Sequence, residues 1–99
     1  MLNDAELKAA LDASPAERIT PAYIESRIKR KLFTGAPEAP TTTLCTLVLD
    51  NGYSVRGESA CVNPANFNRE IGERIAYDDA FRKLWPLFGF LLAEKNFRA

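Results

Sequence analysis

The dipeptide Asn51-Gly52 constrains the fold of this chain more than any other feature of its sequence. Two runs rich in β-branched and apolar residues flank it. Asn-Gly tolerates the positive φ values at both centres of a two-residue type I′ turn, the turn that joins many hairpin strands. The sequence therefore predicts an antiparallel β-hairpin in which Val48 faces Val55.

The first strand of this hairpin is apolar on both faces at Leu47, Val48 and Leu49. A continuous apolar run is typical of a strand that is covered on both sides. We expect a helix on one side and another strand or subunit on the other, since a lone hairpin is marginal in water. The segment 34–42 before the strand has two prolines and a glycine, and it is expected to be a loop.

Two helices are predicted upstream of the hairpin. Asn3 and Glu6 have the spacing of a capping box, so a short helix begins there. Residues 1–15 are expected to form a mobile N-terminal helix, because only Leu7 and Leu11 mark a large apolar stripe and the segment 14–18 interrupts the pattern.

The second helix is predicted to open at Thr20-Pro21, because threonine caps a helix well and proline suits the first helical position. Ile24, Ile28 and Leu32 then recur every four residues. This spacing predicts one apolar stripe along the helix.

A longer helical region is predicted after the hairpin. Asn63-Pro64 repeats the pattern of a cap followed by proline, and apolar residues at spacings of three and four follow as far as Phe97. Pro86 cannot donate a backbone hydrogen bond, so a kink is expected near Trp85. The fold class is therefore α+β, with two N-terminal helices, one antiparallel hairpin and a kinked C-terminal helical region in one domain, 1–99.

The composition argues against several functions. Thirteen basic and thirteen acidic residues balance, so no long-range field attracts nucleic acid or an anionic membrane. The chain has no histidine, the usual general base and the commonest metal ligand. We therefore expect a non-enzymatic protein with no catalytic residue, no metal and no cofactor, located in the cytoplasm.

The two cysteines are expected to be free. In the predicted register Cys45 lies opposite Glu58, and Cys61 lies opposite Thr42. The two thiols then point to opposite faces of the hairpin and cannot form a disulfide. Cys61 precedes a helix and is an alternative candidate for a nucleophile, but no histidine is present to act as its base.

Four polar residues around the junction of hairpin and helix are candidate ligand-binding residues: Arg56, Glu58, Ser59 and Asn66. Glutamate is disfavoured within a strand, and Glu58 shares a face with Arg56, so the two form a surface ion pair or line a pocket. The other charged groups, at 27–31 and 70–82, are interpreted as the solvated faces of amphipathic helices.

The C-terminal region has more apolar residues than one small hairpin can cover. The candidate interface residues are Trp85, Phe88, Leu91 and Leu92. An excess of apolar surface is typical of a protein that binds a partner or forms an oligomer. We expect a homo-oligomer with a further protein partner. The alternative is that the two N-terminal helices fold back and cover these residues within one chain.

The second half of the chain, 41–95, resembles a small tailed-phage family named for gene 49 of one phage and gene 66 of another. The family pattern is "C.L.L.NG..V.GESAC..P.NF..E.G...A...A" followed by "W.L.G..L", and both parts recur here in "CTLVLDNGYSVRGESACVNPANFNREIGERIAYDDAFRKLWPLFGFLL". Asn68 departs from it, since many members have aspartate at that position. The glycines at 57, 72 and 89 belong to the pattern and usually mark close backbone approach.

The resemblance implies a phage or prophage accessory product that acts in the cytoplasm of the infected bacterium. It implies no catalytic residue and no cofactor. The favoured interpretation is a non-catalytic protein that binds a host or phage macromolecule, for example as an antagonist of host defence, by analogy with other small phage products. The alternative is a protein that binds or sequesters a nucleotide at a subunit interface.

Overall fold

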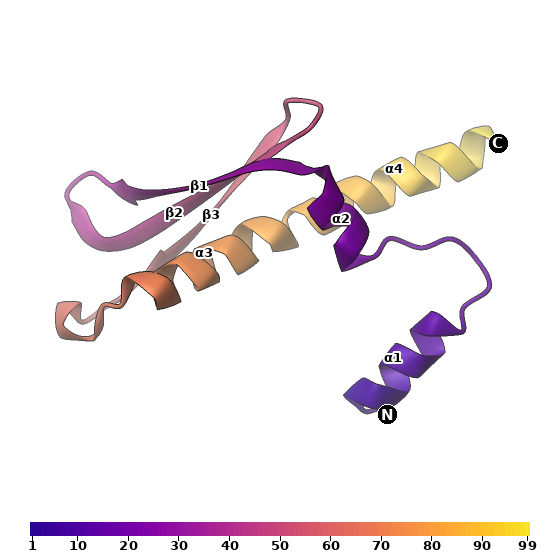
Figure 1. Cartoon of the computed structure of the whole chain (residues 1–99), viewed down its shortest axis with the longest axis horizontal. Helices are drawn as coiled ribbons and strands as arrows, with labels where there is room; N and C mark the ends of the chain where they lie inside the picture. The colour runs from indigo at the N-terminus through magenta and orange to yellow at the C-terminus, as the bar shows by residue number, and fades with distance from the viewer.

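The computed structural model describes all 99 residues as four α-helices, a short 3₁₀ helix and a three-stranded antiparallel sheet (Figure 1). In chain order the elements are α1 (Asp4–Asp12), α2 (Pro21–Arg27), β1 (Ile28–Ala36), β2 (Ala39–Leu49), β3 (Ser54–Ala60), the 3₁₀ helix η1 (Pro64–Asn66), α3 (Arg69–Arg82) and α4 (Leu84–Arg98). The fold class is α+β, as the sequence predicts.

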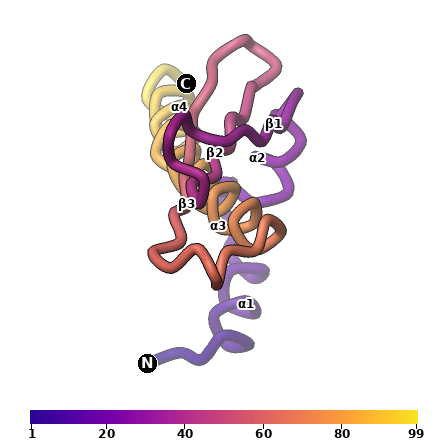
Figure 2. Tube along the Cα trace, turned by 90° about the vertical axis from the view of Figure 1, so that its left-hand side faces the viewer, coloured from indigo at the N-terminus to yellow at the C-terminus, as the bar shows by residue number.

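The molecule is extended. Its principal-axis extents are 50 × 36 × 17 Å and its radius of gyration is 16.8 Å, whereas a compact chain of this length has a radius of about 13 Å. Helix α1 accounts for part of this shape, because it stands apart from the sheet and has no buried residue (Figure 2). The outer half of α4 also projects beyond the sheet (Figure 1).

The predicted helix starts upstream of the sheet are confirmed. The Glu6 N–H donates to the Asn3 side chain at 2.8 Å, and the Glu6 carboxylate accepts from the Asn3 N–H, which completes the capping box. The Tyr23 N–H donates to Thr20 Oγ1 at 3.1 Å at the start of α2. Caps of this kind depend only on residues three apart, so the local sequence is sufficient to predict them.

The predicted extent of the second helix was wrong. Helix α2 ends at Arg27, and the chain continues directly as β1, in which Ile28 pairs with Leu49 and Leu32 with Thr46. The backbone of β1 gains hydrogen bonds from β2 along most of its length, with irregularities between Ile28 and Arg30 and between Gly35 and Ala36. Tertiary pairing of this kind overrides weak helix propensity.

The predicted loop at 34–42 was also wrong. Strand β1 runs to Ala36 and β2 begins at Ala39, and the two are joined by a tight turn in which Glu38 has a φ of 59°. The ladder slips between Gly35 and Ala36, so Pro40 lies in an irregular stretch where a proline costs no ladder hydrogen bond.

The hairpin of β2 and β3 lies where the sequence predicts, but its turn has three residues rather than two. The Gly52 N–H donates to the Leu49 carbonyl at 2.9 Å, and only Gly52, at a φ of 91°, lies in the left-handed region. This is a tight turn closed by a left-handed glycine, the common three-residue loop. Leu47 therefore pairs with Val55, and the predicted pair of Val48 with Val55 was wrong.

The turn is held by a residue far away in the sequence. Arg27, at the end of α2, accepts the Asp50 N–H at its carbonyl at 3.0 Å and donates Nε–H to the Asp50 carboxylate at 2.8 Å. Its guanidinium also lies over the Phe88 ring at 5.5 Å. These contacts join α2, the hairpin turn and α4.

Helix α3 lies across one face of the sheet with a stripe of small residues against it. Gly72, Ala76 and Ala80 are buried at successive turns. A Cβ at Gly57 would collide with the backbone of α3 at the last two of these residues. Glycine at position 57 therefore lets the helix and β3 approach to backbone contact, as the resemblance implies.

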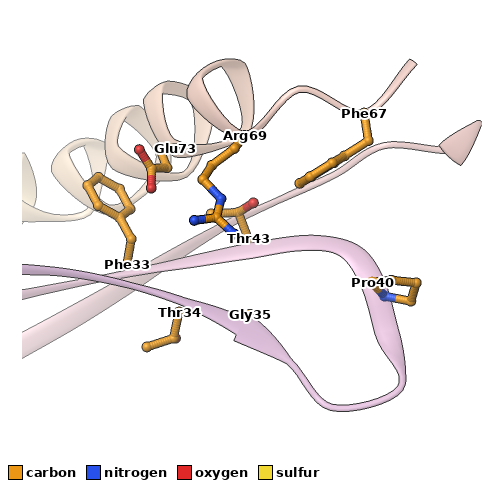
Figure 3. Close-up of a pocket in the computed structure, with 8 residues that line it drawn as sticks. All are labelled: Phe33, Thr34, Gly35, Pro40, Thr43, Phe67, Arg69 and Glu73. Carbon is orange, nitrogen blue, oxygen red and sulfur yellow. The ribbon is translucent and has the colours of Figure 1, made fainter. Parts of the chain in front are cut away.

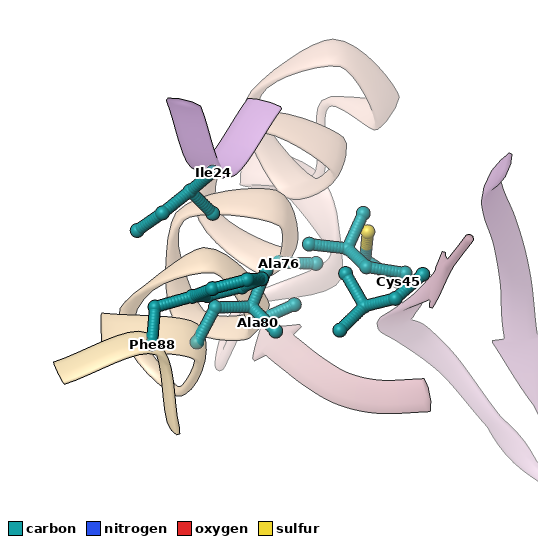
Figure 4. Packing of buried hydrophobic residues seen from close by; sticks show 8 residues of the cluster. Ile24, Cys45, Ala76, Ala80 and Phe88 are labelled. Carbon is teal, nitrogen blue, oxygen red and sulfur yellow. The ribbon is translucent and has the colours of Figure 1, made fainter. Parts of the chain in front are cut away.

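The core forms between the sheet, α3, and the facing sides of α2 and α4 (Figure 4). Its buried members are Ile24, Cys45, Leu47, Leu49, Ala76, Ala80, Leu84 and Phe88. Of the three residues in the stripe that the sequence predicts for the second helix, only Ile24 is buried. The other face of the sheet has no helix over it (Figure 1).

The C-terminal helical region is kinked, as predicted, with a bend of 24°. The break falls at Lys83, so Pro86 is the third residue of α4 and lies in the first turn, where no backbone donor is required. The predicted start of this helical region, at Pro64, was wrong. Asn63 caps only η1, and the long helix begins at Arg69 with Asn68 as its cap.

Candidate functional site

The polar residues at the junction of β3 and α3 mostly bond to backbone. The Ser59 hydroxyl donates to the Gly72 carbonyl at 2.7 Å and so joins the strand to the first turn of α3. The Cys61 thiol donates to the Asn63 carbonyl at 3.1 Å. These hydrogen bonds satisfy backbone carbonyl groups where the chain leads from the sheet into the helix. The polar residues of the junction therefore have an architectural role.

The two asparagines of this junction are helix caps. Asn63 Oδ1 accepts the Ala65 N–H at 3.0 Å, and Asn68 Oδ1 accepts the Ile71 N–H at 3.2 Å. Aspartate and asparagine both accept at this position, so the departure of Asn68 from the family pattern preserves the cap.

The outer edge of β3 is covered at its middle by side chains of the C-terminal region. The Glu58 N–H donates to Asp79 Oδ2 at 3.0 Å, and Lys83 Nζ donates to the Arg56 carbonyl at 2.6 Å. The hydrogen bond from Glu58 N–H, together with one from Arg82, lowers the pKa of Asp79 below its usual value. Asp79 and Lys83 therefore occupy backbone groups that another strand would need.

The four candidate ligand-binding residues do not form one site within the chain. Ser59 and Asn66 line a small hollow of about 160 Å³ beside the junction. Arg56 and Glu58 lie opposite Thr46 and Leu44 in the ladder, on the other face of the sheet. Side chains alternate between the two faces along a strand, so Arg56 and Glu58 lie on the opposite face from Ser59 in any register.

Arg56 and Glu58 belong to the uncovered side of the sheet, which we call the open sheet face. Its residues are Arg30, Leu32 and Thr34 of β1, Thr42, Leu44, Thr46 and Val48 of β2, and Ser54, Arg56, Glu58 and Ala60 of β3. The centre is apolar and hydroxylated. Its charged groups take part in none of the ion pairs of the chain, so the predicted surface pair of Arg56 with Glu58 does not form.

The basic residues at the start of β1 are on a strand, not on the predicted helix face. Lys29 lies in an irregularity of the ladder between Ile28 and Arg30. Lys31 places its ammonium 5.0 Å from the centre of the Tyr77 ring, on the side covered by α3. A charged bulge on an edge strand is a common protection against pairing with other chains.

A second hollow, which was not predicted from the sequence, lies beside the turn between β1 and β2, between the end of the sheet and the start of α3 (Figure 3). Phe33 and Phe67 line it together with the charged side chains of Arg69 and Glu73, and its volume is about 210 Å³. No local sequence signal predicts this hollow, because it forms only where Phe33 of β1 and Phe67, between η1 and α3, come together in the folded chain. This volume is below the range of about 300–1,000 Å³ that pockets for small ligands usually occupy.

The candidate interface residues divide between core and surface. Phe88 is only 2% exposed and packs edge-on against Tyr23, so its assignment to an interface was wrong. It is buried because α2 folds back onto α4. Leu91 and Trp85 remain exposed, and Leu92 is half-buried.

No three side chains among the cysteines, aspartates and glutamates converge in a geometry that would hold a metal ion. None of the helices combines the length and the apolar character needed to cross a bilayer.

The sequence model of the phage protein (N4 Gp49/phage Sf6 gene 66) family matches residues 19–96. The matched range begins just before α2 and ends within α4, so it contains the whole sheet and its covering helix but not α1. No curated protein and no solved structure matches the chain.

Proposed function

The chain belongs to this phage protein family, and from that premise we propose that it is a non-catalytic accessory protein that binds a host or phage macromolecule through its open sheet face. The observation that carries the proposal is the composition of that face. Leucine, valine and threonine side chains form its centre, and unpaired charges surround them.

The shape of this face supports a macromolecular partner. Small ligands bind in concave, largely enclosed pockets, whereas proteins bind over broad surfaces with an apolar centre and a polar rim. Leu44 and Val48 of the central strand are half-buried by their neighbours in the sheet alone. A partner that covers them gains apolar burial and meets Arg30, Arg56 and Glu58 at the margin.

The junction residues support the same proposal because they argue against a small-ligand site. Ser59, Cys61 and Asn63 are engaged by backbone groups or cap a turn, so a ligand would have to displace contacts that hold the fold. The nucleotide-binding alternative requires Arg56 and Glu58 beside Ser59 and Asn66, and one chain places these two pairs on opposite sides of the sheet. A protein that binds in this way would act, for example, as an antagonist of host defence.

The test uses a photo-crosslinking amino acid at Thr46, in the centre of the open sheet face, during infection. We expect one dominant macromolecule to be crosslinked there and none from the control position Val62, which is fully exposed in the loop between β3 and η1. Val48→Asp is expected to abolish the crosslink with little change in melting temperature, and Val62→Asp is expected to preserve it.

Two results would overturn the proposal. One is a crosslink from Val62 that is as strong as the one from Thr46. The other is a nucleotide released on denaturation of the protein purified from infected cells, in an amount close to one per chain, with no crosslinked macromolecule at Thr46.

A further inference from the structure

Helix α4 has two apolar sides, and only one of them is used within the chain. Leu84 and Phe88 face the core. On the outer side, Pro86, Phe90, Ala93 and Phe97 follow one another at spacings of four, three and four, which places them in one line on a helix. We call this line the outer stripe. Phe90 is 66% exposed and Phe97 is 81% exposed.

Gly89 is next to the outer stripe and has no explanation within the chain. A Cβ at this position would meet no atom within 4 Å. Glycine is the least favourable residue after proline in the interior of a helix. Position 57 must be glycine because the backbone of α3 lies against it. By the same reasoning, Gly89 indicates that another molecule approaches the helix closely at this position.

The exposed area of the chain leaves room for a large contact with another molecule. The accessible surface is 7436 Å², whereas a compact monomer of this mass exposes about 5,600 Å². The excess is about 1,800 Å² for each chain, of which the detached helix α1 accounts for part, and a standard interface buries about 800 Å² for each partner. Burial of less than half of the excess would therefore be sufficient for a stable dimer.

The outer stripe is complementary to itself. The large Phe90 ring and the small residues Gly89 and Ala93 lie within about one turn of each other, so an antiparallel copy can place its Phe90 over the small residues of the first. A two-fold interface requires this self-complementarity. The stripe has no charge, and the neighbouring Glu94 and Arg98 already pair with each other.

We propose that a second copy of this chain docks on the outer stripe of α4, with the two α4 helices antiparallel across a two-fold axis. Phe90 of each copy packs on Gly89 and Ala93 of the other, and Phe97 packs near Pro86. This interface differs from the one expected from the sequence, because Phe88 and Leu92 face inward. It leaves the open sheet face free and does not depend on the function proposed for that face.

Light scattering coupled to size-exclusion chromatography tests the dimer. At micromolar concentration the wild-type chain is expected at twice its mass of 11.0 kDa. Phe90→Glu is expected at the mass of one chain, because a carboxylate would be buried without a partner. Tyr53→Glu is the matched control: Tyr53 is similarly exposed, at 57%, but lies at the hairpin turn, and this variant should remain a dimer.

Gly89→Leu keeps the test decisive if Phe90→Glu fails to fold. Space for the new side chain is open within the chain, so the helix should form at least as well, while the dimer should dissociate at least about tenfold more readily. A wild-type mass near that of one chain would overturn the proposal. A dimer that persists in both Phe90→Glu and Gly89→Leu would also overturn it, and would place the interface elsewhere.

Discussion

Replacement of Asp79 by alanine tests how the C-terminal helical region is attached to the edge of the sheet. The variant leaves the Glu58 N–H without its acceptor, and hydrogen bonds to charged groups contribute about 1.5–3 kcal/mol. The paired arginine, Arg82, is 72% exposed, so its ion pair adds little. We expect Asp79→Ala to lower the free energy of unfolding by about 2 kcal/mol.

The matched control is the neighbouring residue. Asp78 forms a similar ion pair with Arg74 one turn earlier, but that pair is fully on the surface and caps no strand. Asp78→Ala should therefore change stability by less than about 0.5 kcal/mol. Urea denaturation followed by the fluorescence of Trp85, the only tryptophan, measures both variants.

The same contact predicts a pH dependence. The pKa of Asp79 is lowered in the folded state relative to its usual value of 3.8, so its stabilising contribution is present above that value. The contribution is lost as the pH falls through the lower, folded-state pKa. The stability gap between wild type and Asp79→Ala should thus be constant near neutral pH and should narrow in acid. If Asp79→Ala is as stable as Asp78→Ala, or if the gap widens in acid, the proposed attachment is wrong.

Three further comparisons test the packing of the fold, the first two by urea denaturation and the third by melting temperature. Gly57→Ala should cost about 3 kcal/mol or more, since its Cβ collides with the backbone of α3, whereas Gly35→Ala, with open space around it, should be nearly neutral. Phe88→Ala should cost about 3–5 kcal/mol because the ring is buried, while truncation of the exposed Phe97 should cost little in the isolated chain; equal losses would contradict the assigned core. Deletion of residues 1–15 should leave the melting temperature unchanged, because no side chain of α1 is buried; a marked drop would show that α1 contributes to the folded body.

Features that depend on a few neighbouring residues could be predicted from the sequence. The caps at Asn3 and Thr20, the break near Pro86 and the position of the hairpin all follow from local chemistry. The register of the hairpin could not, because Asn-Gly fits both a two-residue and a three-residue turn, and in the structure Arg27, 23 residues away, also bonds to Asp50 within the turn. A pattern read along the chain contains no information on such a contact.

Strand β1 and the candidate site were missed for related reasons. The four-residue spacing of Ile24, Ile28 and Leu32 fits a helix, yet residues 28–36 pair with β2 along one edge. Once this strand was assigned to a helix and a loop, the open sheet face had no third strand. Both cysteines are free, as expected, but the reason given was wrong. The observed register places Cys45 opposite Gly57 and joins the Cys61 N–H to Thr41, so four positions along the strands separate the thiols.

The covered edge of β3 limits how copies of this protein can aggregate. A sheet that grows without end needs two free edges, one to receive a strand and one to offer the next. Here Asp79 and Lys83 occupy the middle of one edge, and only β1 remains available, with Lys29 in its bulge. Pairing through β1 therefore stops after two molecules, because the joined sheet has a blocked edge at each end.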